Sequence, residues 1–71
     1  MKTEETKTLM DGLFEEMNRC RELLKEYQAI GPAGTFGAYF LHQEIEAAER
    51  SIRENDIVKM VQAYENLKEA K

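Results

Sequence analysis

Cysteine, proline and long apolar runs are scarce in this chain. The scarcity of cysteine excludes internal disulfides, and the lack of long apolar runs argues against a membrane-spanning helix. The single cysteine, Cys20, has no second thiol within the chain, so no internal disulfide supports the fold. No apolar run approaches the ~20 residues of a membrane-spanning helix. The start MKTEETKTL carries acidic residues where a signal peptide would be basic and then hydrophobic. We therefore expect a cytoplasmic protein in a reducing compartment, with no membrane as partner.

Charge and size restrict the partners further. The chain has 14 acidic and 10 basic residues among its 71, a net charge of −4, which disfavours nonspecific binding to nucleic acid. A chain of this length buries only about 60% of the surface that its unfolded form exposes, so its own core gives marginal stability. Association with a second copy, or with another protein, is the remaining way to stabilise the fold.

What the chain does contain is apolar residues at helical spacing, and the clearest series predicts a first helix over residues 4–30. Thr3 is a candidate N-cap, followed by two glutamates that favour the positive end of the helix dipole. The inner seam alternates three and four residues apart, as in a heptad, and consists of Met10, Leu13, Met17, Cys20, Leu24 and Tyr27. Gly12 interrupts this helix, and we expect it to allow close approach of a neighbour.

Three evenly spaced glycines separate this helix from the next; they are Gly31, Gly34 and Gly37. Gly31 stands where a left-handed residue would end a helix, and Pro32 cannot extend the hydrogen-bond ladder. The second helix begins at Pro32 or at Thr35; we favour Thr35 as N-cap and predict residues 35–54. A phosphate-binding loop would need a preceding strand and a following lysine, which are absent, so we interpret the glycines as turn and close-packing residues.

The second and third helices each show one apolar face. In the second helix the stripe consists of Ala38, Leu41, Ile45, Ala48 and Ile52. Asn55 can take the left-handed conformation that ends this helix, and Asp56 can cap a third helix over residues 56–69. The apolar face of the third helix consists of Ile57, Met60, Val61, Tyr64 and Leu67.

These patterns predict an all-α fold, an antiparallel three-helix arrangement in one domain over residues 1–71. The first helix would be about 39 Å long and the third only about 21 Å, so part of the first helix's seam would stay uncovered. Completion by dimerisation is the simplest way to cover it.

No arrangement of side chains points to catalysis. Cys20 lies in an apolar seam that disfavours the thiolate, which makes it a packing residue and not a nucleophile. His42, Glu46 and Glu49 share a helical face whose spacing suits a metal in principle, although three polar residues on one helix more often form a solvated face. We predict no enzyme activity, catalytic residue, metal or cofactor.

An alternative function is DNA recognition. The second helix, the turn at 55–56 and the third helix could form a helix-turn-helix, with Lys59, Gln62 and Asn66 reaching the major groove. The acidic balance and Glu65 on the same face argue against it, because phosphates would repel them.

The favoured function is that of a small adaptor or regulator that binds another protein, its expected partner being a second copy. The predicted interface consists of Phe14, Met17, Phe36, Tyr39 and Phe40. Phe36 and Phe40 lie roughly 120° or more from the centre of the apolar stripe of their helix, so they need another partner. Either these rings bind a second chain, or they cap the end of the bundle against Leu23, Tyr27 and Ile30.

Overall fold

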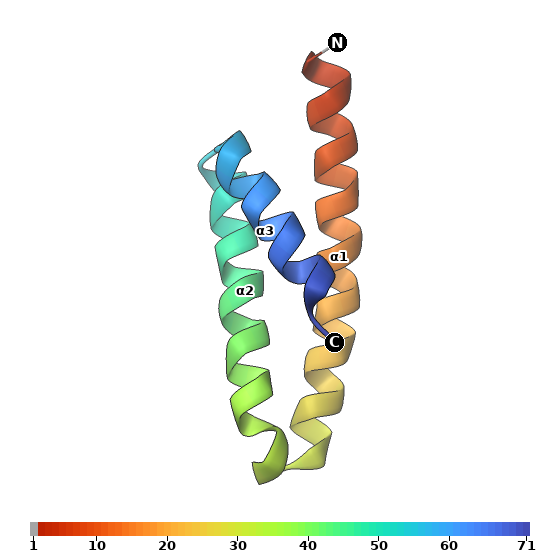
Figure 1. The fold of residues 1–71 in the computed structure, drawn as a ribbon, viewed down its shortest axis with the longest axis vertical. Coiled ribbons are helices and arrows are strands. Elements are labelled where there is room, and N and C mark those ends of the chain that lie inside the picture. Colours follow the sequence, from red (N-terminus) through yellow and green to blue (C-terminus); the bar gives the residue numbers. More distant parts are fainter. Residues whose placement is uncertain (1) are drawn as a thin grey trace.

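Three α-helices and one turn of 3₁₀ helix make up the described part of the chain (Figure 1). The computed structural model describes the backbone of residues 2–71 and the side chains of residues 8–71. The elements are α1 (Lys2–Ile30), η1 (Pro32–Gly34), α2 (Thr35–Arg53) and α3 (Ile57–Glu69). No strand occurs within 2–71, and each helix packs against the other two. The all-α, three-helix prediction is confirmed.

The helices are arranged as a long hairpin with a shorter third helix laid over one half of it. α1 and α2 run antiparallel, and α3 turns back from the end of α2 and ends about midway along α1 (Figure 1). The half of the hairpin near η1 therefore consists of α1 and α2 alone. The resulting shape measures 46 × 17 × 16 Å. As predicted from the helix lengths, α3 with 13 residues cannot cover α1 with 29.

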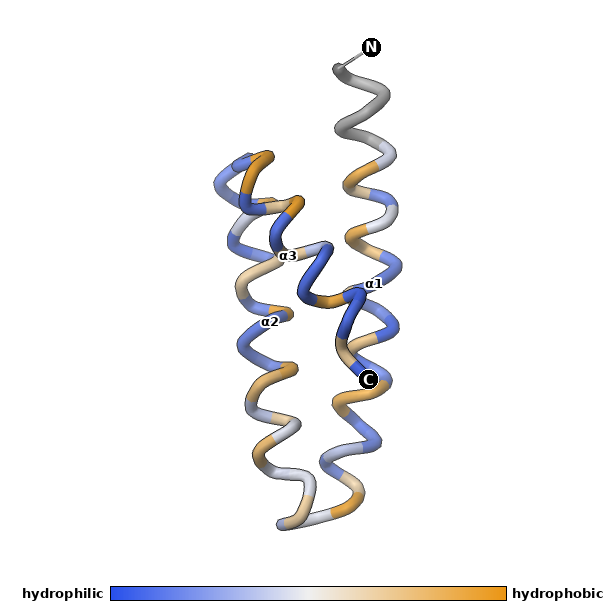
Figure 2. The backbone as a smooth tube through the Cα atoms, viewed as in Figure 1, coloured by the Kyte–Doolittle hydropathy of each residue, from blue (hydrophilic) through white to orange (hydrophobic). Residues whose placement is uncertain are grey.

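The core lies where the three helices meet, and the predicted seams of α1 and α2 supply most of it. Figure 2 shows apolar positions recurring along both helices. The buried apolar residues are Leu13, Met17 and Cys20 of α1, Leu41, Ile45 and Ala48 of α2, and Met60, Ala63 and Leu67 of α3. Leu24, Tyr27 and Ile52, from the ends of the same stripes, pack against this cluster while partly exposed. The spacing of apolar residues therefore identified the inner faces of α1 and α2 correctly.

The predicted face of α3 is wrong in part. Ile57 and Val61 are 43% and 44% exposed, whereas Ala63, which the predicted face omitted, is 4% exposed. Met60, Ala63 and Leu67 follow one another three and four residues apart, and this series faces the core. Val61 follows Met60 directly and so points about 100° away around the helix.

The turn between α1 and α2 depends on two glycines. Gly31 has φ +88°, a backbone conformation that side-chain-bearing residues rarely adopt. Gly34 is buried against the backbone of α1, and a Cβ there would lie 2.0 Å from the carbonyl oxygen of Tyr27. Pro32 occupies the first turn of η1. Thr35 is the first residue of α2 and not its N-cap, because η1 runs directly into α2 and Gly34 takes the cap position.

The second turn follows the prediction closely. Asn55 has φ +53°, and the side chain of Asp56 accepts a hydrogen bond from the backbone N–H of Lys59 at 3.1 Å. α2 ends at Arg53 and α3 begins at Ile57, so the two helices are joined by three residues. The N-cap predicted at Thr3 concerns a side chain outside the described residues; the backbone of α1 is helical from Lys2.

Side chains of α1 donate hydrogen bonds to carbonyl groups in the last turn of α3 and just beyond it. Nη2 of Arg19 donates to the carbonyl oxygen of Leu67 at 2.6 Å, and Sγ of Cys20 donates to the same oxygen at 3.5 Å. The hydroxyl of Tyr27 donates to the carbonyl oxygen of Lys71. The last carbonyls of a helix have no partner within it, so these bonds fix where α3 ends on α1.

Candidate protein-binding surface

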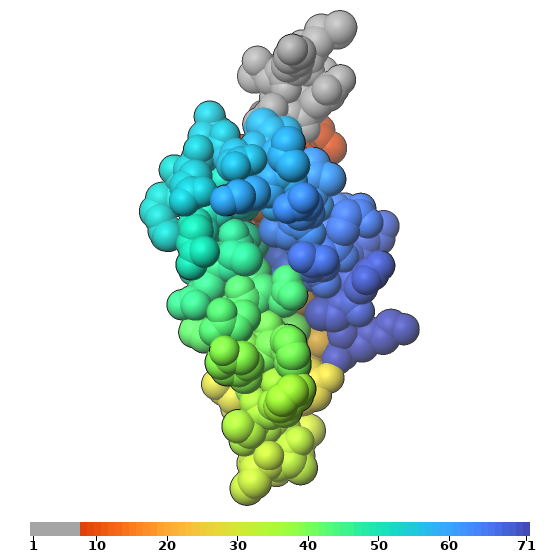
Figure 3. Space-filling model, turned by 60° about the vertical axis from the view of Figure 1, so that its left-hand side comes forward, coloured from red at the N-terminus to blue at the C-terminus, as the bar shows by residue number. Residues whose placement is uncertain are grey.

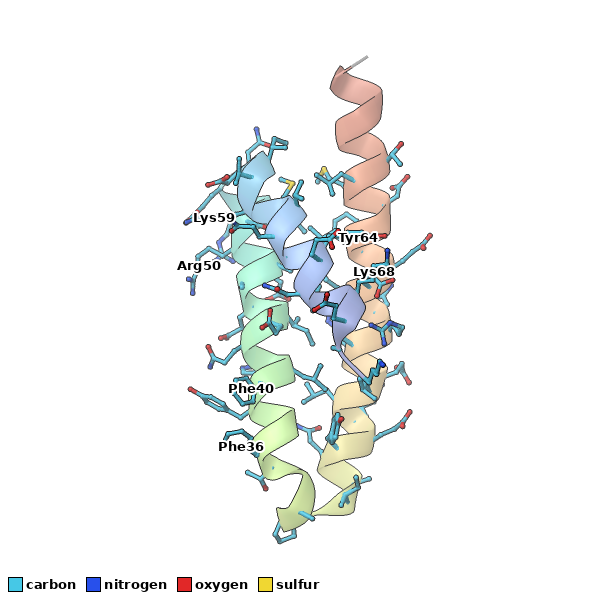
Figure 4. The ribbon with its side chains drawn as sticks, in the orientation of Figure 1. Phe36, Phe40, Arg50, Lys59, Tyr64 and Lys68 are labelled. Carbon is cyan, nitrogen blue, oxygen red and sulfur yellow. The ribbon has the colours of Figure 1, made fainter. Side chains whose placement is uncertain are left out.

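Three aromatic residues stand on the outside of α2 and form what we call the outer aromatic cluster: Phe36, Tyr39 and Phe40. Their side chains are 73%, 60% and 52% exposed. Phe36 and Phe40 point away from α1, on the same side of α2 as Arg50 (Figure 4). In Figure 3, which brings this side forward, the green surface of α2 forms the front of the lower half of the molecule.

The rings of the outer aromatic cluster contact one another. The centroids of Phe36 and Phe40 lie 4.9 Å apart with their planes at 67°, and those of Tyr39 and Phe40 lie 6.2 Å apart at 72°. Both pairs have the edge-to-face geometry that aromatic rings prefer. The rings thus form one connected apolar surface that stays accessible to water.

Tyr27, and not the outer aromatic cluster, closes the end of the bundle. The ring of Tyr27 packs over Gly37, where an added Cβ would lie 3.1 Å from Cε1 of that ring. Gly37 therefore serves the close approach predicted for it, and Gly12 does the same for the ring of Tyr64, at 3.2 Å. With Tyr27 in this place, Phe36 and Phe40 remain on the outer side of α2.

Two residues of the predicted interface lie elsewhere. Met17 is only 2% exposed and belongs to the core that all three helices share, so its prediction as an interface residue does not fit the structure. Phe14 is 45% exposed but lies about 24 Å along α1 from the turn, far from the outer aromatic cluster near the start of α2. The structure therefore brings together three of the five predicted residues.

The outer aromatic cluster begins a longer stripe that runs along α2 and ends at Glu54, the residue that follows its last turn. We define the outer stripe as the exposed positions Phe36, Phe40, Gln43, Ala47, Arg50 and Glu54. They follow one another at alternating spacings of four and three residues, like the inner positions of a heptad. This spacing is present in the sequence, but the sequence-based prediction did not identify it, because the inner stripe of α2 has the stronger apolar signal.

Two hollows border this surface. One, of about 340 Å³, lies beyond the end of α3, between Phe40, Leu41 and Tyr27 on one side and Glu69 and Lys71 on the other. The second, of about 230 Å³, runs between α2 and α3 and is lined by Ala47, Arg50, Ser51, Lys59, Gln62, Ala63 and Asn66. Both are shallow surface features next to the outer stripe.

The residues considered for chemistry are engaged in structural contacts. Cys20 is fully buried, and burial raises the pKa of its thiol, an effect that the positive charge of Arg19 partly offsets. Nε2 of His42 lies 3.4 Å from Glu46, while Glu49 pairs with Arg21 at 3.0 Å. Within the described side chains, no three His, Cys, Asp or Glu residues gather as metal ligands.

Three backbone N–H groups of the glycine-containing turn already have acceptors within the chain. The N–H of Gly31 donates to Gln28, that of Gly34 to Gly31, and that of Thr35 to Pro32. A phosphate at this turn would need N–H groups that point outward without a partner. The turn is therefore built for chain reversal.

Comparison with protein-family models, with curated proteins and with solved structures found no significant match to this chain. In the part of the chain that the structure describes, no helix combines the length and the apolar character that crossing a membrane requires.

Proposed function

We propose that this protein acts as a small adaptor or regulator by binding another protein through the outer aromatic cluster, and that its partner is a second copy of the chain. The observation that carries the proposal is the exposure of Phe36, Tyr39 and Phe40, at 73%, 60% and 52%. Aromatic residues are enriched at protein interfaces, where their burial dominates the binding energy.

The position of the cluster supports this role. The three rings lie on the outer side of a helix whose inner side already packs with Leu41, Ile45 and Ala48. Their exposure is therefore not explained by the needs of the fold. The lone buried Cys20 suits a reducing compartment such as the cytoplasm, where we place this activity.

Photo-crosslinking in the cells that make the protein tests the proposal. A photo-reactive phenylalanine analogue replaces Tyr39, which is 60% exposed within the cluster. The matched control carries the analogue in place of Lys25, whose side chain is 71% exposed on α1. We expect discrete protein adducts from position 39 and not from position 25. Equal labelling from both positions, or no adduct from position 39, would contradict the proposal.

A second candidate function is DNA binding by α2 and α3. Its specific support is the hollow between these helices, in which Arg50 and Lys59 stand beside Gln62 and Asn66. Cationic groups contact phosphates and amide groups read base edges, so the residue types fit such a role. The pairing of Lys59 with Glu54 at 3.9 Å and the net charge of −4 weaken it. Retention on DNA at low salt that is lost in Lys59→Glu would support this candidate; no retention would refute it.

A further inference from the structure

The outer stripe of α2 has two chemically different halves. Phe36 and Phe40 occupy the half near the start of the helix, and Arg50 lies in the half near its end, with the small Ala47 between them. All six positions of the stripe are exposed, and none belongs to the core. Among the side chains of residues 8–71, no ion pair within 4.0 Å involves Arg50. Aromatic faces and a guanidinium group therefore stand on one seam without contacting each other.

These two halves are complementary only when two copies of α2 run antiparallel. Consider a two-fold axis level with position 45. It places each position of one copy opposite the position of the second copy for which the two residue numbers average 45. Phe40 then lies opposite Arg50 of the second copy, and Gln43 lies opposite Ala47 of the second copy. Each contact occurs twice, as in any interface in which both copies use the same surface.

We infer that the protein forms a symmetric dimer through antiparallel pairing of α2 with α2 of a second copy, an inference that rests on the proposed function and specifies the geometry of that association. Arg50 of each copy stacks on Phe40 of the other, a cation–π contact made twice. Ala47 at the middle allows the two helices to approach closely. Phe36 lies opposite Glu54 of the second copy, a carboxylate that reaches Lys59 of its own chain at 3.9 Å.

Parallel pairing of the same stripes is unfavourable. It would place Arg50 opposite Arg50 and Glu54 opposite Glu54, and like charges facing each other across an interface are repulsive. The alternating four and three spacing supports either direction, so charge decides between them. The antiparallel arrangement places each Arg50 guanidinium against an aromatic ring and separates the like charges, while Glu54 keeps Lys59 of its own chain within 3.9 Å.

The expected dimer is modest in size. Large aromatic side chains contribute about 150–250 Å² each when buried, and the three rings of the cluster are half to three-quarters exposed before association. They supply roughly 300–450 Å² per copy, about half of the ~800 Å² per partner in a standard interface. The rest of the stripe adds to this area. We therefore expect a reversible dimer that forms at micromolar to submillimolar concentration.

Sedimentation equilibrium of the whole chain measures this association. Phe40→Ser should abolish dimerisation, and Arg50→Gln should weaken it about tenfold, because two cation–π contacts are lost. Arg50→Glu should weaken it further. Lys25→Glu makes the same charge reversal on α1 and should leave the dimer unchanged. Circular dichroism of each variant confirms that it is folded.

Disulfide trapping tests the direction of pairing. A mixture of Gln43→Cys chains with Ala47→Cys chains should give covalent dimers, whereas Glu54→Cys chains alone should not. Cys20 of the parent chain is fully buried and should give none. Cross-linking of Glu54→Cys chains with one another, or a dimer insensitive to Arg50→Gln, would overturn the antiparallel arrangement. A strictly monomeric chain would overturn the dimer and the second copy as partner. Adducts from position 39 with other proteins would then show that the outer aromatic cluster still binds a protein, so the failure of the dimer is distinguishable from the failure of the binding surface.

Discussion

Gly34 is the position at which one added methyl group should do the most damage. Its backbone has φ −94° and ψ −3°, in the bridge region at negative φ that side-chain-bearing residues also occupy, so the backbone conformation itself does not require glycine. The added Cβ would nevertheless lie 2.0 Å from the carbonyl oxygen and 2.8 Å from the carbonyl carbon of Tyr27. These are backbone atoms, which cannot rotate away as a side chain can. Relief requires α1 and η1 to separate.

The cost follows from two opposing effects. Forcing an extra methyl group into a packed contact costs typically 1–3 kcal/mol, and a clash with backbone belongs at about 3 kcal/mol or above. Replacing glycine restricts the unfolded chain and returns about 0.4–1 kcal/mol. We therefore expect Gly34→Ala to destabilise the protein by at least about 2 kcal/mol. In a domain of this size that lowers the melting temperature by about 10 °C or more.

Gly37→Ala is the matched control. Its Cβ would meet the ring of Tyr27 at 3.1 Å, and a ring at the end of a flexible side chain can move by a few tenths of an ångström. Alanine also favours the helix by up to about 1 kcal/mol over glycine. Thermal unfolding followed by far-UV circular dichroism should show Gly37→Ala within about 1 kcal/mol of the parent chain. If Gly34→Ala and Gly37→Ala have the same melting temperature, the close contact between η1 and α1 does not exist.

Three further predictions follow from burial, capping and ionisation. Leu13→Ala should cost about 2–5 kcal/mol in chemical denaturation because Leu13 is 0% exposed, and a smaller loss than from the partly exposed Leu24→Ala would contradict the assigned core. Asp56→Ala should cost about 1 kcal/mol by removing the cap on Lys59, whereas Asp56→Asn, which keeps the acceptor oxygen, should restore most of it. Because burial raises the pKa of Cys20 above its ordinary value of 9.0, the folded chain holds this proton more tightly than the unfolded chain. Stability should therefore be unaffected by this group below pH 9.0 and should fall as the pH rises above it, a fall that Cys20→Ala should lack in denaturation curves.

Local signals in the sequence predicted the helices and their turns well. Asn55 and Asp56 act through their own backbone and that of the next turn, so their roles follow from residue type and position. The seam of α1 follows from spacing in the same way. The face of α3 was predicted wrongly in part, because Val61 and Ala63 flank Met60 on opposite sides and hydrophobicity alone favours valine. Only the packing of the three helices selects the smaller residue.

The candidate surface was predictable in its residue types but not in its exposure. Phe36 and Tyr27 both could have closed the end of the hairpin, and the sequence does not say which ring does so. The contact of Tyr27 with Gly37 decides it in three dimensions. The bond from Arg19 to Leu67 joins residues 48 positions apart, so no local pattern could reveal it. Met17 was wrongly predicted as an interface residue, because apolar residues have the same heptad-like spacing in a core and in an interface.

The division of α2 into an inner and an outer side has a consequence for how this protein can change. Side chains at 36, 40, 43 and 50 can be exchanged in a library while Leu41, Ile45 and Ala48 are left untouched, and most members should still fold. Selection for a new partner could then act on one side of a single helix, with the scaffold unaffected.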